Sequence, residues 1–307
     1  MKHLSIFAKR ALELLLLSIL TLINYFAILL VLVALGSLTL KIAPSLLTTE
    51  QESFVLLELL ILIPAFISIG YSLLCLTPFS SWLVRVMSRF KPLSPYDNYR
   101  ISEYIKELNF KKKLKFYTIK DSNYHVVGVG KNSLAFSSTA LENCSEEELK
   151  GAICHNLKHF ELGDNRFTTL FFSIMQLSSR LFFMLYWAIE WVLKLILGLL
   201  AYLIPALRKF SRKSVKLWRA FYLLFFNMIY VSLFIVYASI SRKHEYLCDS
   251  YVTKSGYADG LISFLEKKSP YEQSIQPTTY VEYVSNLHPA ILRRIYNLQN
   301  NIDFDEK

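Results

Sequence analysis

Three long stretches of the chain contain no charged residue: Leu14–Leu40, Leu59–Val84 and Ala220–Ile240. A helix crosses a bilayer with about 20 predominantly apolar residues, so each stretch is long enough to span a membrane. Residues 167–207 form a fourth apolar block, whose charged residues are Arg180, Glu190 and Lys194. As one helix this block would be about 60 Å long, twice the apolar core of a bilayer. The pattern predicts an α-helical multi-pass membrane protein, in which the fourth block is either a span that continues past the membrane or a span with a shorter returning piece.

The polar segments between the apolar stretches have the residue patterns of short helices and strands. Tyr99–Leu108 has the spacing of an amphipathic helix. Three β-like runs follow it: Leu114–Ile119, Tyr124–Val129 and Ser133–Ser138. The last two are joined by Gly130-Lys131-Asn132, which is typical of a hairpin. These segments predict a helix-rich α+β domain with a small mixed sheet.

The alternation of apolar and polar segments divides the chain into four parts. We expect a two-span membrane region at residues 1–84, a polar domain core at 85–166, a second membrane region at 167–240, and the rest of the polar domain at 241–307.

The basic residues predict how this protein lies in the membrane. The 307-residue chain has a formal net charge of +10. Lys2, Lys9 and Arg10 precede the first apolar stretch, Lys41 alone supplies positive charge before the second, and many Lys and Arg residues follow it. Cytoplasmic loops carry such an excess of basic residues, so the polar domain is predicted to face the cytoplasm. The predicted partner is membrane lipid, and nucleic-acid binding is not expected.

The segment CHNLKHFELGD, residues 154–164, holds the candidate chemistry. His155 and His159 are four residues apart, so on a helix both imidazoles face the same side and can bind one metal ion. Ser145 with Glu148 predicts a capping box that opens this helix, and Gly163 predicts its end. The zinc protease pattern H-E-x-x-H has the same histidine spacing but places a glutamate, the general base, where Asn156 stands.

A third ligand is needed for a metal site, and Glu245 in SRKHEYLCDSY is the candidate. Two histidines and a carboxylate leave one position open for water, as catalytic zinc requires. Asp249, four residues on, is suited to orient a ligand histidine from behind. The alternative is that these acids belong to a solvated face beside Arg242 and Lys243, and that the two histidines are ordinary polar residues.

Four motifs in this order resemble the membrane zinc metallopeptidases of the HtpX and CAAX prenyl protease type, over about Leu114 to Leu298. They are DSNYHVVGVGKNSLAFSSTAL, EEELKGAICHNLKHFELGD, SRKHEYLCDSY and LHPAILRRIYNL. The resemblance implies a gluzincin-like metallopeptidase domain in a bacterial inner membrane. It implies that one Zn²⁺ is held by His155, His159 and Glu245, with Asp249 behind them.

The resemblance also implies two elements on the substrate side. The substrate strand corresponds to Asn123, Tyr124, His125 and Val126, where the family has Asn-Ala-Phe-Ala. His288, in the His-Pro element, corresponds to a transition-state stabiliser, and a simple turn before a helix is the alternative for it.

The main departure from the family is Asn156, because an amide cannot accept a proton from zinc-bound water. General acid–base help contributes about 10²- to 10⁴-fold, so activity should fall by at least that scale. Three functions follow. The protein is a pseudoprotease that binds zinc and protein chains, an active metalloendopeptidase for membrane or misfolded proteins, or a structural membrane protein with a vestigial site.

The site also constrains the membrane topology. Glu245 meets the histidines only if an even number of crossings lies between them, and one crossing in each apolar block satisfies this. That places the basic loop Arg208–Arg219 outside, against the positive-inside tendency. In the alternative, residues 167–207 form a hairpin that returns to the cytoplasm and Ala220–Ile240 is buried without crossing.

Overall fold

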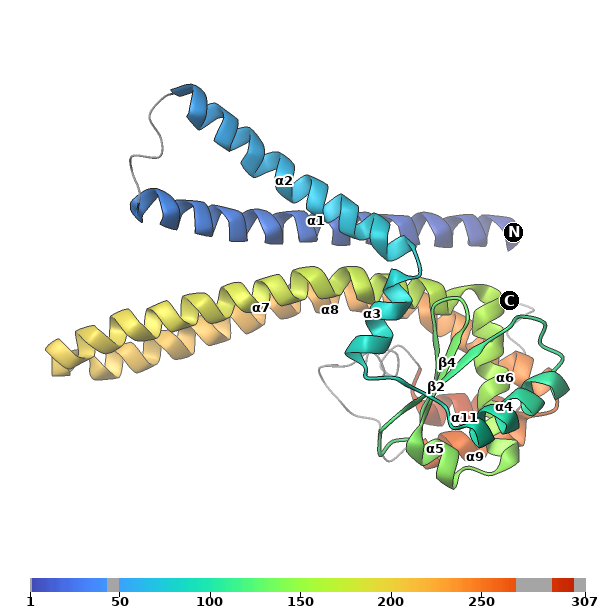
Figure 1. Cartoon of the computed structure of the whole chain (residues 1–307). Coiled ribbons are helices and arrows are strands. Elements are labelled where there is room, and N and C mark those ends of the chain that lie inside the picture. The colour runs from blue at the N-terminus through green and yellow to red at the C-terminus, as the bar shows by residue number, and fades with distance from the viewer. Residues whose placement is uncertain (1, 43–49, 269–288, 301–307) are drawn as a thin grey trace. The chain divides into compact units, whose positions relative to one another are not determined.

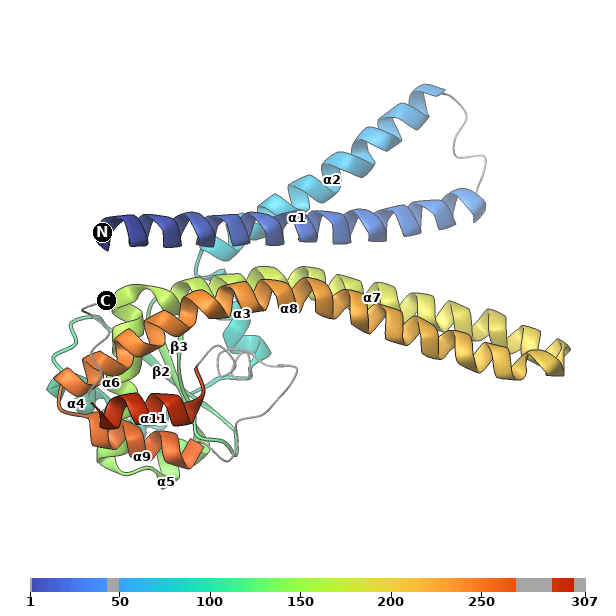
Figure 2. The same ribbon diagram turned by 180° about the vertical axis from the view of Figure 1, so that it is seen from behind.

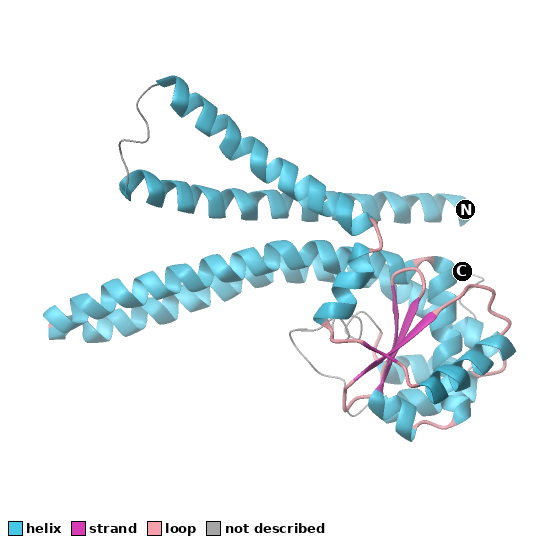
Figure 3. Ribbon diagram, in the orientation of Figure 1, coloured by secondary structure: helices cyan, strands magenta, loops and turns pink. Residues whose placement is uncertain are grey.

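A computed structural model describes residues 2–42, 50–268 and 289–300 of the chain. Contacts divide the chain into two units, each built from two separate stretches. Unit 1 comprises residues 1–74 and 174–235, and unit 2 comprises residues 75–173 and 236–307. Unit 1 is helical, and unit 2 combines helices with a sheet (Figures 1 and 3).

Unit 1 contains helix α1 (Lys2–Ile42), most of α2 (Glu50–Leu76), and the adjoining parts of α7 (Asp164–Leu203) and α8 (Arg208–Lys254). In the described residues, Ala11–Val33 of α1 and the whole of α7 are long and apolar enough to cross a membrane. The pair Ile61–Leu76 and Phe79–Met87 makes a third span if it counts as one broken helix. A crossing at Ala220–Ile240 stays a prediction.

The apolar block at residues 167–207 contains no returning piece. Helix α7 is continuous for 40 residues, so that alternative is wrong. The helix ends just before Pro205, which has no N–H to continue the helical hydrogen bonds and disfavours helical geometry in Ile204. A short 3₁₀ turn, Pro205–Leu207, leads into α8, and Figures 1 and 2 show the two long helices side by side in both views.

A buried amide connects the helices of unit 1. Asn24 of α1 is fully buried. Its Nδ2 donates to the carbonyl oxygen of Ile174 at 3.0 Å, and its Oδ1 accepts from the N–H of Ser178 at 2.9 Å. Tyr230 of α8 donates to Ser178 Oγ at 2.8 Å. Polar contacts of this kind join apolar helices that have little hydrophobic drive to associate in lipid.

Within the described part of unit 2, four strands form a sheet in the order β1-β2-β4-β3. The strands are β1 (Lys91–Pro92), β2 (Lys115–Ile119), β3 (Val126–Val129) and β4 (Ser133–Ser137). β2 and β4 are parallel, whereas β1–β2 and β3–β4 are antiparallel. The predicted small mixed sheet is therefore confirmed, with the predicted hairpin between β3 and β4.

The described residues of unit 2 also form six shorter helices. They are α3 (Phe79–Met87), α4 (Pro95–Glu107), α5 (Ser138–Asn143), α6 (Glu146–Leu162), α9 (Ala258–Lys268) and α11 (Ile291–Gln299). α4 begins earlier than the apolar spacing predicts, because Ser94 Oγ accepts the N–H of Asp97 and Pro95 suits the first helical turn.

Helix α6 lies at the centre of unit 2 and is buried on several sides. One face packs with α4 and β4 through residues such as Leu149, Ile153 and Phe136. The other packs against α9 and α11 through Cys154 and its neighbours. The crossing with α9 is close: a Cβ on Gly151 would lie 2.5 Å from the backbone nitrogen of Leu261. Because α6 is enclosed in this way, the histidines that it carries are removed from solvent.

Candidate metal centre

The ends of α6 are fixed by its own sequence. Ser145 Oγ accepts the N–H of Glu148 at 3.3 Å, and Glu148 Oε2 accepts the N–H of Ser145 at 2.7 Å, which is the predicted capping box. The helix ends at Gly163 with φ 79°, a left-handed conformation that glycine adopts without steric cost. With both ends held, His155 and His159 lie one above the other on the same face.

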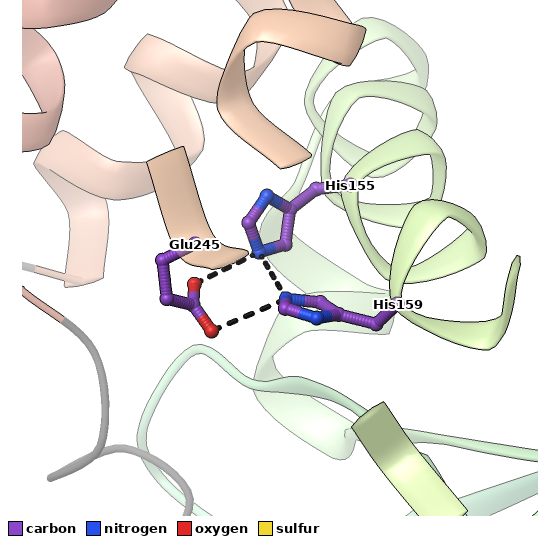
Figure 4. Close-up of side chains that lie close together, drawn as sticks. All are labelled: His155, His159 and Glu245. Atoms are coloured by element: carbon purple, nitrogen blue, oxygen red, sulfur yellow. Dashed lines mark hydrogen bonds and ion pairs between the residues drawn. The ribbon is translucent and has the colours of Figure 1, made fainter. Parts of the chain in front are cut away.

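His155, His159 and Glu245 meet in the structure (Figure 4). The Nε2 atoms of the two histidines are 3.1 Å apart, and each lies 3.2 Å from one carboxylate oxygen of Glu245. All three side chains are at least 94% buried. Two ligand atoms of one tetrahedral zinc ion, each about 2.0–2.1 Å from it, are a little over 3 Å apart. His155 approaches Oε2 and His159 approaches Oε1 of the carboxylate, and one ligand atom from each of the three residues lies within 4.8 Å of the other two, a spacing that suits ligands to a single ion.

Both histidines are held from behind by carboxylates. Nδ1 of His155 lies 3.0 Å from Asp249 Oδ1, and Nδ1 of His159 lies 3.3 Å from Asp164 Oδ2. A carboxylate accepts hydrogen bonds, so in a metal-bound site each Nδ1 would donate its proton to the carboxylate behind it and each Nε2 would offer its lone pair to the ion. This tautomer is the one that binds a metal through Nε2, and the donor set fits zinc.

Arg294 of α11 completes the centre, and sequence reasoning missed it. Its guanidinium binds Asp249 through two hydrogen bonds, Nε to Oδ2 at 2.9 Å and Nη2 to Oδ1 at 2.7 Å. Nη1 lies 3.8 Å from Glu245 Oε2, and the side chain is 98% buried. The segment LHPAILRRIYNL could have indicated an inward arginine, because only every third or fourth position of a short helix faces the core. The sequence does not show which of Arg293 and Arg294 is the inward one.

These charges set the protonation of the site. Burial alone raises the pKa of the Asp249 carboxyl, but Arg294 and His155 outweigh it and hold that pKa below its usual value. Burial alone lowers the pKa of His159, but Cys248, Glu245 and Asp164 outweigh it and raise that pKa well above its ordinary value. Asp249 is thus an anion, and the charges around His159 favour its protonated form when no metal is bound.

Cys248 lies next to this centre and is fully buried. Burial raises the pKa of its thiol to about 11. The group of ligand atoms within 4.8 Å of one another comprises His155, His159 and Glu245 and does not include this sulfur.

Asn156 is directed toward strand β3. Its Oδ1 accepts the N–H of Gly128 at 3.1 Å, and its Nδ2 donates to the carbonyl oxygens of Val126 and Ala152, both at 3.0 Å. The orientation of the amide is fixed by its partners, because an N–H only donates and a carbonyl only accepts. Both Nδ2 protons are used, and none is left for a reacting group.

The segment predicted to pair with substrate leads into β3. Val126 is the first residue of the strand, whereas Asn123, Tyr124 and His125 precede it. His125 is buried, its Nε2 lies 3.6 Å from Asp121 Oδ2, and it is outside the group of candidate ligands. His288 lies outside the described residues, so its predicted role stays a prediction.

Two histidines from one helix and a glutamate from a distant one, each histidine backed by a carboxylate, are the ligand arrangement of a zinc metallopeptidase. The chain belongs to peptidase family M48, whose family model matches residues 98–302. The ligands, both outer carboxylates and Arg294 all lie within the matched region.

Comparison with solved structures finds the crystal structure of S. mikatae Ste24p, with a TM-score of 0.41 and 18% sequence identity. The match covers 78% of this chain and 57% of that one, so the chain spans little more than half the length of that protein. A search of the curated proteins found no match.

Proposed function

We propose that this chain is an HtpX-type membrane member of family M48 that binds one zinc ion and cleaves peptides poorly or not at all. The ion is held by His155, His159 and Glu245, whose ligand atoms converge in a buried site. Zinc in such a site polarises a scissile carbonyl and lowers the pKa of its water. The protein supplies the rigid ligand set, through the contacts of Asp249 and Asp164 with the two histidines.

The hydrogen bonding of Asn156 carries this proposal. A general base must be able to accept a proton, and a carboxamide has no basicity to do so near neutral pH. Its protons are also donated to Val126 and Ala152, so the side chain is held by the protein rather than directed at a substrate. The resulting protein is a pseudoprotease, with a binding or regulatory role in place of hydrolysis.

The partners follow from the same proposal. Helices long and apolar enough to cross a membrane support membrane lipid as one partner. Membrane proteins, unfolded chains or a regulatory protein are the partners that a peptidase-like domain beside a membrane would bind. The excess of basic residues after the second apolar stretch supports a cytoplasmic side for this domain, and the HtpX-type resemblance supports a bacterial inner membrane.

The first test is the zinc content of the detergent-purified chain, with His155→Ala as the matched variant. About one zinc per chain, lost in His155→Ala, is expected for a site of this ligand set. Absence of zinc from both proteins would contradict the proposal and favour a structural protein with a vestigial site.

The second test is hydrolysis of an unfolded protein such as reduced casein. The proposal predicts no zinc-dependent cleavage by the wild type. Cleavage that disappears in His159→Ala would instead identify an active peptidase. Asn156→Glu adds a base and should gain hydrolysis if its carboxylate faces the metal. If Asn156→Glu binds zinc but does not hydrolyse the protein, the loss of activity is not due to Asn156 alone.

A further inference from the structure

Strand β3 forms one edge of the sheet, and alternate residues face its outer side. β4 lies on one side of β3, and the described residues place no strand on the other. The carbonyl oxygen of His125 accepts the N–H of Ser137, the last residue of β4, so the backbone groups of His125 point toward β4. The N–H and carbonyl groups of Val126 and Gly128 therefore point away from β4, toward the outer edge. An outer edge of this kind is where an extended peptide can add as a further strand.

Asn156 occupies the two groups that such a peptide would use. Gly128 offers the N–H and Val126 offers the carbonyl, and the carboxamide satisfies one with its oxygen and the other with its nitrogen. A neighbouring strand presents the same pair of a donor and an acceptor. The side chain of Asn156 is itself 92% buried, so these bonds are protected from water.

The start of α7 extends this cover along the strand. Thr169 Oγ1 accepts the N–H of Gly130, the next outward-facing residue, at 2.8 Å. The side chain of Asn165 packs onto Gly128 so closely that an added Cβ there would lie 2.0 Å from Asn165 Nδ2. The outward backbone groups of Val126 and Gly128 are therefore bonded to Asn156 and the N–H of Gly130 is bonded to Thr169, while Asn165 covers a face of the strand.

From these contacts we infer that Asn156 is a positioning residue that closes the β3 edge at Val126 and Gly128 against pairing with a peptide. The inference rests on the proposed function, in which position 156 no longer serves as a general base. A glutamate at this position cannot make the same contacts, because two of the three partners are carbonyl oxygens and a carboxylate has no proton to donate. Position 156 can therefore hold either an asparagine that closes the edge or a glutamate that acts as a general base. In this chain it closes the edge.

Amide hydrogen exchange of the segment 124–130 tests the contact directly, in the full-length chain in detergent. Asn156→Ala removes all three hydrogen bonds, and Asn156→Asp keeps the shape but removes both donors. One hydrogen bond contributes about 0.5–1.5 kcal/mol, so exchange at Gly128 should become about two- to tenfold faster in Asn156→Ala. Asn143→Asp, an exposed substitution at the end of α5, is the control and should leave exchange unchanged.

Binding of a fluorescein-labelled peptide of alternating threonine and valine then tests the closure. The peptide should bind Asn156→Ala at least about tenfold more tightly than the wild type, which corresponds to a gain of about 1.4 kcal/mol. It should also restore slow exchange at 124–130. Asn156→Asp should show a smaller gain, and it serves as the test variant if Asn156→Ala does not fold.

Two results would overturn the inference. Exchange unchanged in both Asn156 variants would mean that the amide does not hold the strand, and faster exchange without tighter binding would mean that it does not bar a peptide. Zinc content measured on the same samples separates this inference from the proposed function. A chain without zinc that still shows the exchange and binding effects would contradict the proposed metal site and support the closure of the edge.

Discussion

Arg294 and Asp249 form a two-bond ion pair in the interior of unit 2, with Nε–Oδ2 and Nη2–Oδ1 distances of 2.9 and 2.7 Å. The same Asp249 oxygen that accepts from Nη2 lies 3.0 Å from Nδ1 of His155. A residue of the last described helix thereby fixes the orientation of a histidine in the middle of the chain.

Replacement of Arg294 by lysine should weaken zinc binding. Lysine keeps the charge but cannot make two parallel hydrogen bonds to Asp249, so the carboxylate holds His155 less firmly. Loss of such supporting contacts lowers metal affinity by about 10- to 100-fold. Competition with a chromophoric chelator measures the change. Arg293→Lys, at the exposed neighbouring position, is the control and should bind zinc as the wild type does.

Asp164→Asn should also weaken zinc binding, at the other histidine. Asp164 Oδ2 lies 3.3 Å from His159 Nδ1 and 2.9 Å from His244 Nδ1, so one carboxylate orients both rings. An amide is a poorer acceptor and no longer opposes the charge, and a loss of about tenfold or more in affinity is expected. The exposed Asp259→Asn provides the comparison. Equal affinity in the two variants would show that His159 does not depend on Asp164.

Zinc affinity should increase with pH through the neutral range. The pKa of His159 is raised well above its ordinary value, so in the metal-free chain this imidazole is protonated at pH values where an isolated histidine is neutral. A ligand must lose that proton to bind zinc, and below its pKa each unit of pH costs about tenfold in affinity per proton released. Chelator competition at several pH values between about 6.5 and 8.5 measures the slope. A flat profile would mean that His159 is neutral before zinc binds.

Gly151→Ala should destabilise unit 2. The new Cβ would lie 2.5 Å from the backbone nitrogen of Leu261 and 2.9 Å from the carbonyl carbon of Gly260, so α6 and α9 must separate. Overpacking of this kind costs about 1–3 kcal/mol, more than the roughly 1 kcal/mol that alanine gains over glycine in a helix. Thermal unfolding in detergent should show a lower Tm. Gly198→Ala in α7, with no atom within 4 Å of the new Cβ, should not lower it.

Local sequence predicted the local elements because their causes lie within a few residues. The capping box of Ser145 and Glu148 and the left-handed Gly163 gave both ends of α6. The β-like runs and the Gly130-Lys131-Asn132 turn gave the β3–β4 hairpin. Pro205 marks the end of α7, although the apolar pattern alone left open whether the chain turned back earlier.

The sequence by itself determined the helical spacing of His155 and His159, the apolar stretches, and the absence of a glutamate at position 156, because each depends only on which residues stand in which order. Tertiary structure alone decided which distant side chains meet these residues. Arg294 is 139 residues from His155, and the pattern of a short helix does not reveal whether it or Arg293 faces inward. Asn156 was recognised as a lost base, but its contacts with Val126 and Gly128 depend on how α6 packs against an edge strand. That packing is a sum of many weak contacts across the fold, which no local stretch of sequence contains.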